Sequence, residues 1–327
     1  MNNGSGIFKS FAIAVVIVLA GFLLLFEEIH FGWIIARNPI FKPLFRELAT
    51  SGNSRISTYS IDSLISMLSP NDFDFWLKVL ENPSSDDYLK GHALLALRAI
   101  NNPKAIDAIT NVFENTNKLN AGSSNSSWVW AFTALAKMKG EAFCPEILKI
   151  WGDSSYALKE EALGIINYCP AKIAIQNIDP LFKSPESITL TFKNGNTKDN
   201  TADEIHDLQG KALSSLSNSN SPEVIAYLID LSNSENMAFV EMSIAQLSKI
   251  VRTSPQFKEV LKGVFITKLN PNYPDNIRLA SLNTLYNVYG SESYNIFKQY
   301  ENDPSIGKAV KQGLEIMERN KNLKENY

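Results

Sequence analysis

Apolar and small residues recur at helical spacing along most of the chain. In residues 88–115, Leu89, Ala93 and Leu97 lie four residues apart and so share one face of a helix. The same order, apolar then small then large apolar, recurs almost to the C-terminus: Tyr59/Ser63/Met67, Leu158/Ala162/Ile166, Leu208/Ala212/Leu216, Phe239/Ser243/Leu247, Ile277/Ser281/Leu285, Ala309/Gly313/Met317 and a partial copy at Ala131/Leu135. A small residue at a fixed helical position lets a neighbouring helix approach closely, so this pattern predicts stacked helices.

A break follows each of these first helices, and it often contains a proline: Pro70, Pro103, Pro145, Pro170, Pro222 and Pro255. Proline is tolerated in the first turn of a helix, so each break predicts the start of a second helix. The second helices have apolar stripes of their own, such as Val224, Ile225 and Leu228. Helix pairs at intervals of 30–40 residues are typical of an α-solenoid. The pattern therefore predicts an all-α array of about seven helix pairs and a terminal helix.

The copy at residues 275–282 resembles the first helix of a HEAT repeat, because the acidic Asp275 precedes the basic Arg278 and the small Ser281. Lys90 and Lys159 take the basic position in two other copies, whereas the copies at Gln209 and Val240 depart from it. The resemblance covers residues 58–320, and it implies an armadillo-like α-solenoid that serves as a binding scaffold. In such arrays the second helices line the concave side. The resemblance thus points to a set of charged second-helix residues as protein-binding: Lys104, Asp107, Glu146, Lys149, Glu223, Lys258 and Lys262.

A gap of 50 residues between Ala162 and Ala212 places an insertion at residues 183–203. Within it, apolar residues alternate with polar ones and an Asn-Gly pair follows: Ile188, Leu190, Phe192 and Asn194-Gly195. This order predicts a small β-hairpin at residues 187–198. Insertions in repeat proteins often lie on a binding face. A solvent-exposed decoration without a binding role is the alternative.

The N-terminal part contains a long apolar run, residues 11–26, without a charged side chain. With its flanks, residues 7–29, it is long enough for the roughly 20 residues that a bilayer core requires. We therefore expect a single transmembrane helix that contacts the lipid bilayer, with a cleaved signal peptide as the alternative. Basic residues after the run favour a cytoplasmic array, whereas the acidic pair Glu27-Glu28 and the very short N-terminus favour the opposite side. We expect a single-pass protein of the bacterial inner membrane with its repeats extracytoplasmic.

These patterns divide the chain into four parts. They are a membrane anchor at residues 1–29, a juxtamembrane segment and linker at 30–57, the repeat array at 58–320, and a charged tail at 321–327. The segment at residues 30–48 mixes aromatic with basic side chains. Two interpretations stay open for it, a position in the lipid headgroup layer and a first helix that packs against the array.

Composition narrows the candidate chemistry. The 327 residues have a formal net charge of −3, and acidic residues interrupt the lysines of the second helices, so no basic stripe forms for nucleic acid. The three histidines, His30, His92 and His206, have no second ligand at metal spacing. Nucleotide-binding and nucleophile motifs are absent from the sequence, so we expect no cofactor and no catalytic site.

The two cysteines, Cys144 and Cys169, stand at matching places, each directly before the proline of a break. Equivalent positions in adjacent repeats are expected about 8–10 Å apart, the spacing of packed helices. A disulfide requires Cα atoms within about 7 Å. We therefore expect two reduced thiols, with a disulfide as the alternative.

The anchor and the array together predict a non-enzymatic scaffold that binds another protein at the membrane. An enzyme related to the HEAT-like lyases that attach chromophores is the alternative from another class, and it would need a ligand pocket. A nucleic-acid-binding helical repeat is a further alternative, which the charge pattern disfavours. No small-molecule substrate is identified in the sequence.

Overall fold

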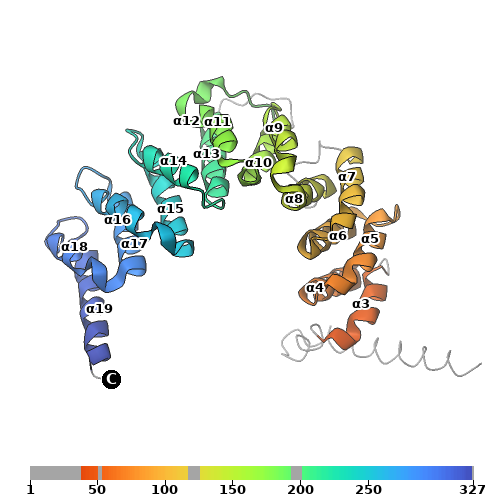
Figure 1. Ribbon diagram of the computed structural model, residues 1–327, viewed down its shortest axis with the longest axis horizontal. Helices are drawn as coiled ribbons and strands as arrows, with labels where there is room; N and C mark the ends of the chain where they lie inside the picture. Colours follow the sequence, from red (N-terminus) through yellow and green to blue (C-terminus); the bar gives the residue numbers. More distant parts are fainter. Residues whose placement is uncertain (1–37, 51–53, 117–125, 193–200, 326–327) are drawn as a thin grey trace, which may run out of the picture. The chain divides into compact units, whose positions relative to one another are not determined.

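The computed structural model describes residues 38–50, 54–116, 126–192 and 201–325. These residues are helical nearly throughout, which confirms the all-helical repeat (Figure 1). The chain divides into two compact units. Of the described residues, the first unit contains those up to Thr116 and residues 126–134, and the second contains those from Leu135 onward.

The helices follow the order that the sequence predicts. The first helices are α4 (Ser54–Ser66), α6 (Asp87–Ile100), α8 (Ser127–Lys139), α10 (Tyr156–Gly164), α13 (Thr201–Leu216), α15 (Met237–Thr253), α17 (Asp275–Thr284) and α19 (Gly307–Glu325). The second helices are α5 (Phe73–Glu81), α7 (Ile106–Asn115), α9 (Cys144–Trp151), α11 (Ala171–Ile178), α14 (Pro222–Ser232), α16 (Lys258–Thr267) and α18 (Tyr294–Gln299). The remaining helical elements are α3 (Lys42–Ala49), α12 (Pro180–Lys183), the 3-10 turns η1 (Pro39–Phe41), η2 (Pro70–Asp72), η3 (Pro103–Ala105), η5 (Gly140–Phe143), η6 (Ile166–Tyr168), η7 (Pro185–Ser187), η8 (Pro255–Phe257) and η10 (Gly290–Ser293), and the π-helical η9 (Leu285–Tyr289).

The small residues of the repeat pattern are buried between helices, as predicted. Ala93, Ala162 and Ser243 have no exposed surface. Gly313 shows why the position must be small. A Cβ atom added to it would lie 2.7 Å from Cε1 of Phe297, closer than two carbon atoms can pack.

The sequence predicts that each first helix pairs with the second helix after it, but the structure shows a different pairing. Most second helices pack most closely with the first helix that follows, as α5 does with α6, α9 with α10, α14 with α15 and α16 with α17, whereas α7 and α11 pack on other second helices, α5 and α14. The first helices also stack on one another, α13 lying between α10 and α15 in the second unit (Figure 1). The sequence pattern gives the length of the repeat. It does not tell which two neighbouring helices form the closer pair, because every helix is joined by a loop to a helix on either side.

The basic position of the repeat has a definite structural role in the second unit. Its side chain donates a hydrogen bond to a main-chain carbonyl in or just after the preceding helix, and carbonyls near a helix C-terminus lack partners within the helix. The three bonds join Lys159 Nζ to the Trp151 oxygen at 2.8 Å, Gln209 Nε2 to the Leu181 oxygen at 2.6 Å, and Arg278 Nε to the Leu269 oxygen at 2.9 Å. Gln209, which departs from the HEAT pattern in charge, thus forms the same kind of bond as the basic residues.

The predicted transmembrane helix requires a correction. No helix among the described residues is both long and apolar enough to cross a bilayer. Residues 7–29, on which the prediction was based, lie outside the described residues. The fold prediction is wrong in this element, and so is the single-pass inner-membrane location that depended on it. Hydropathy of one short run was its only support, whereas the described helices are amphipathic elements of a stacked array.

The predicted β-hairpin is also wrong, since the described residues contain no β-strand. Residues 193–200, which include its turn, lie outside them. The preceding arm forms a single bridge instead, in which Thr191 bonds through its main chain to Ser154 and Tyr156 at 2.8 and 3.0 Å. Leu190 is buried, and the Phe192 ring stacks on that of Tyr156. Phe192 therefore packs against the first residue of α10.

For the basic and aromatic segment at residues 30–48, the sequence left open a position in the lipid headgroup layer or a helix packed on the array. The structure describes this segment from residue 38 onward. Phe45 and Ala49 of α3 are buried, and α3 packs on α4. Lys42 and Arg46 bind the buried carboxylate of Asp72, in η2, at 2.7 and 2.6 Å. This part of the segment is therefore a helix of the array.

The same carboxylate should make the first unit sensitive to acid. Burial raises the pKa of Asp72, but hydrogen bonds from Lys42, Arg46 and Ser69 outweigh it and hold the pKa below its ordinary value. The stability that these bonds contribute is thus present above the unfolded-state pKa of about 3.9 and is lost as the pH falls through the lower folded-state pKa. Urea unfolding of the Asp72→Asn variant should therefore depend less on pH between about 5 and 2 than that of the natural chain. The Asp74→Asn variant, changed at an exposed carboxyl of α5, should keep the natural dependence, and equal slopes for the two variants would contradict the assignment.

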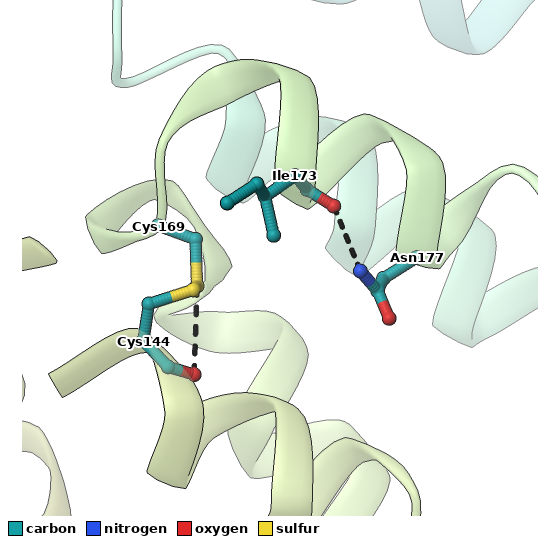
Figure 2. The surroundings of a disulfide bond; sticks show 4 residues. All are labelled: Cys144, Cys169, Ile173 and Asn177. Carbon is teal, nitrogen blue, oxygen red and sulfur yellow. Dashed lines mark hydrogen bonds between the residues drawn. A yellow bond between two sulfur atoms is a disulfide. The ribbon is translucent and has the colours of Figure 1, made fainter.

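The two cysteines form a disulfide, so the expectation of reduced thiols is wrong (Figure 2). Their Cα atoms are 4.9 Å apart, and both residues are buried. Cys144 is the first residue of α9, but Cys169 follows η6 and precedes the start of α11 by two residues. The chain at Cys169 therefore approaches α9 more closely than the axes of two packed helices do. The indole Nε1 of Trp151 also donates to the Asn177 oxygen at 3.1 Å, which joins α9 to α11 a second time.

Candidate binding groove on α13

An open groove of about 500 Å³ lies on the stacked first helices of the second unit. Its floor and one end come from α13 and the turn that follows it, and its sides come from α10 and α15. The lining residues are Gly164, His206, Asp207, Gly210, Lys211, Ser214, Ser215, Asn218 and Met242. A volume of this size is within the range of about 300–1,000 Å³ for sites that bind small molecules.

The spacing of residues on α13 explains the groove. His206, Gly210, Ser214 and Asn218 follow one another at intervals of four and so form one stripe along the helix. The two residues in the middle of the stripe have the shortest side chains. A Cβ atom added to Gly210 would have its nearest heavy atom, Sδ of Met242, at 3.9 Å, so the space above this glycine is open.

Polar contacts hold both sides of the groove. On the α10 side, Lys211 Nζ forms an ion pair with Oε1 of Glu160 at 2.9 Å, and Ser215 Oγ donates to Oδ1 of Asn167 at 3.0 Å. On the α15 side, Lys249 Nζ donates to Oδ1 of Asn218 at 2.7 Å. The walls are therefore fixed by neighbouring helices, while the side chains of His206, Asp207 and Ser214 are exposed to solvent.

The end of the groove near the start of α13 is acidic. Burial raises the pKa of the nearby Tyr156, and the charges of Glu160, Asp207 and Glu204 raise it further. Burial also raises the pKa of Glu161, against the opposing effect of Lys211. Near the opposite end, the ammonium group of Lys249 bonds to Asn218, which lines the groove.

The charged residues that the sequence singled out lie on other surfaces. Lys104 and Asp107 are exposed on η3 and α7 of the first unit. The others are on second helices of the second unit, with exposed side chains on α9 and α14 and half-buried ones on α16: Glu146, Lys149, Glu223, Lys258 and Lys262. These residues therefore belong to different helices in the two units, and their binding role stays a prediction.

Lys258 and Lys262 already have partners within the chain. Their Nζ atoms lie 3.3 and 3.6 Å from the Glu292 carboxylate and 5.1 and 5.4 Å from the ring centre of Tyr289. A ligand that bound these lysines would have to compete with Glu292. Of the predicted residues, they are therefore the least available for a partner.

The groove residues were not predicted from the sequence. His206 has no second ligand at metal spacing in the sequence, and the stripe of which it is part has no apolar periodicity to mark it. The regular interval of four between His206, Gly210, Ser214 and Asn218 was the available signal. Among the described residues, no three or more histidine, cysteine or acidic side chains are placed to hold a metal ion.

Comparisons with known proteins add little to this geometry. No family model matches the chain, and no curated protein matches it. A solved structure of human deoxyhypusine hydroxylase in complex with glycerol is similar over 88% of this chain and 96% of that one, at 10% identity and a TM-score of 0.30. An engineered protein is similar over 84% of this chain and 77% of its own, at 14% identity and a TM-score of 0.29. Neither likeness carries an argument about the function of this chain.

Proposed function

We propose that this chain is a protein-binding scaffold and that the α13 groove receives an extended segment of a partner protein. The observation that carries the proposal is the open groove on α13, lined by exposed imidazole, hydroxyl and carboxamide groups. The role proposed is binding rather than catalysis.

The chemistry of the stripe favours an extended segment over a helix. Imidazole, hydroxyl and carboxamide groups both donate and accept hydrogen bonds. The main chain of an extended segment has free N–H and C=O groups that need such partners, whereas the main chain of a helix has satisfied them internally. A partner helix would instead require a row of apolar anchors, and Met242 is the one large apolar side chain in the lining.

The length of the stripe sets the size of the segment. From His206 to Asn218 the chain rises by about 18 Å at 1.5 Å per residue, if the turn after α13 is counted as helix. An extended chain rises by about 3.3 Å per residue, so about five residues of a partner span the groove.

The repeat type is part of the proposal, and we infer that the array is of the HEAT kind. Two features support this. Arg278 and Lys159 occupy the basic position of the resemblance and are buried where they bond to the preceding helix. The small residues at the close-packing position, such as Ala162 and Ala212, are fully buried.

Filling the groove should separate binding from stability. Gly210 lies inside α13, and glycine in a helix interior costs about 0.5–1 kcal/mol relative to alanine. A Gly210→Gln variant should therefore unfold at a slightly higher temperature than the natural chain, because its Cβ has room. The same variant should lose the partner, because its side chain occupies the groove. Photo-crosslinking from a benzophenone amino acid at position 214 of the full-length chain, together with thermal unfolding, measures both effects.

A second helix-interior glycine provides the matched control. Gly263 of α16 also has open space at its Cβ and lies outside the groove. The Gly263→Gln variant should gain similar helix stability and keep the crosslinked product. Equal crosslinking in the Gly210→Gln variant, or no product from position 214 beyond that from the exposed position 315 on α19, would overturn the proposed function.

A further inference from the structure

Given the proposed function of the groove, on which this rests, we propose that the bound segment places a lysine or arginine side chain at the acidic end of the groove, beside Asp207. The partner is thus an extended peptide segment with a positive charge at one end. The proposal rests on the carboxyl groups near this end, two of which have no cationic partner among the described residues.

Carboxyl groups from two helices surround the acidic end. Glu160 and Glu161 come from α10, and Glu204 and Asp207 come from α13. Three of these groups act electrostatically on the same side chain, Tyr156, so they share one region of space. Lys211 lies beside them; among the described residues its ion pair is with Glu160, at 2.9 Å, and its charge also acts on Glu161.

Two of the carboxyl groups lack a cationic partner among the described residues. Asp207 is exposed and lines the groove, and no ion pair joins it to the described residues. Glu204 has one carboxylate oxygen that is buried without a hydrogen-bond donor there. A buried acceptor without a partner costs free energy, more so when it is charged. A cation bound beside Asp207 would lower this cost at a distance, without having to reach the buried oxygen.

The floor of the groove fixes where that cation lies. The groove runs along α13 over Gly210 and Ser214 to Asp207. Asp207 is one helical turn from Lys211 on the same face. A main chain that follows the groove therefore has one end beside Asp207 and the other beside Asn218 and Lys249. A cationic side chain at the first end meets attraction from Asp207, whereas an acidic one there would be repelled by it. Nucleic acid, which is negatively charged, would meet the same repulsion.

Three fluorescein-labelled heptapeptides test the charge preference with the full-length chain. The first contains serine with two lysines, and the other two replace both lysines with glutamine or glutamate. In fluorescence anisotropy, the lysine peptide should bind about tenfold more tightly than the glutamate peptide, with the glutamine peptide between them. Raising the salt concentration from about 50 to about 300 mM should reduce the difference, because screening weakens exposed charge pairs.

Two variants test the place of binding. Asp207→Asn should weaken the lysine peptide about two- to fivefold, in line with the loss of one partly exposed ion pair. Glu315→Gln, changed at an exposed carboxyl of α19, should leave its affinity unchanged. Gly210→Gln should abolish binding of the lysine peptide, and Gly263→Gln should not.

The outcomes distinguish this assignment from the proposed function. Equal affinity for the three peptides, no effect of Asp207→Asn, or no binding of the lysine peptide at about 1 mM would overturn the cationic segment. If position 214 still crosslinks to a partner in a groove-dependent way, the scaffold function stands without it. If the lysine peptide binds as described but position 214 captures no protein, the cationic site stands and the protein-binding function falls.

Discussion

Replacing Arg278 with methionine should lower the free energy of unfolding of the second unit by about 3–5 kcal/mol, the usual effect of removing one partner of a buried ion pair. The Arg278 side chain is 3% exposed and pairs with the carboxylate of Asp303, which is 9% exposed. It also donates to the Leu269 oxygen at 2.9 Å. Methionine retains much of the volume but leaves both acceptors without this donor. Urea unfolding followed by circular dichroism, with hydrogen exchange of the α17 amides, measures the loss.

Two further variants control this prediction. Arg252→Met changes an exposed arginine of α15 and should alter the stability by less than about 0.5 kcal/mol. Adding Asp303→Asn to Arg278→Met removes the unpaired charge and should restore part of the loss. The hydrogen bond from Arg278 holds the pKa of Asp303 below its ordinary value, against the effect of burial. A loss below about 1 kcal/mol for Arg278→Met would show that the pair is not a buried one in solution.

Removing the disulfide should lower the free energy of unfolding of the second unit by about 3–4 kcal/mol. Cys144 and Cys169 are 25 residues apart in sequence, and closing a loop of this length restricts the unfolded chain by about that amount in the chain-entropy model. The expected result is the same for dithiothreitol treatment and for the double variant Cys144→Ser with Cys169→Ser. Urea unfolding of the oxidised, reduced and substituted chains provides the measurement.

The reagent itself needs a control. Dithiothreitol should leave the double variant unchanged, because this variant has no thiols to reduce. Equal stability of the oxidised chain and the double variant would show that the bond does not restrict the unfolded state.

The helices could be predicted from the sequence because their cause is local and repeated. An apolar, a small and a large apolar residue four positions apart specify a buried face, and Ala93, Ala162 and Ser243 are buried as this requires. Which two helices form the closer pair could not be predicted in the same way. The close contact of α9 with α10 depends on how the turn between them packs, and the apolar pattern is alike on both sides of every break.

The candidate site could not be predicted, because it consists of exposed positions on which the apolar pattern has no bearing. Neither the open space above Gly210 nor the charges that reach Tyr156 can be found without knowing which helices adjoin α13. The disulfide was missed for a related reason. The expected distance assumed equivalent helical positions, whereas Cys169 lies in a loop. The β-hairpin was predicted because apolar and polar residues alternate in this segment. In the structure the alternation has another cause, because Leu190 is buried and the Phe192 ring stacks on Tyr156 at the start of α10.

A stack of helices can bend, because each helix pair can shift slightly relative to the next. The bond between Cys144 and Cys169 acts against such bending, because it holds the first residue of α9 and the loop before α11 with their Cα atoms 4.9 Å apart. Helix α10 lies between these two residues in sequence, and its last residue, Gly164, lines the groove. We therefore expect oxidation to restrict the movement of one wall of the groove before any ligand binds. A stiff wall loses less freedom on binding, so the reduced chain should bind a segment in this groove more weakly even where it stays folded.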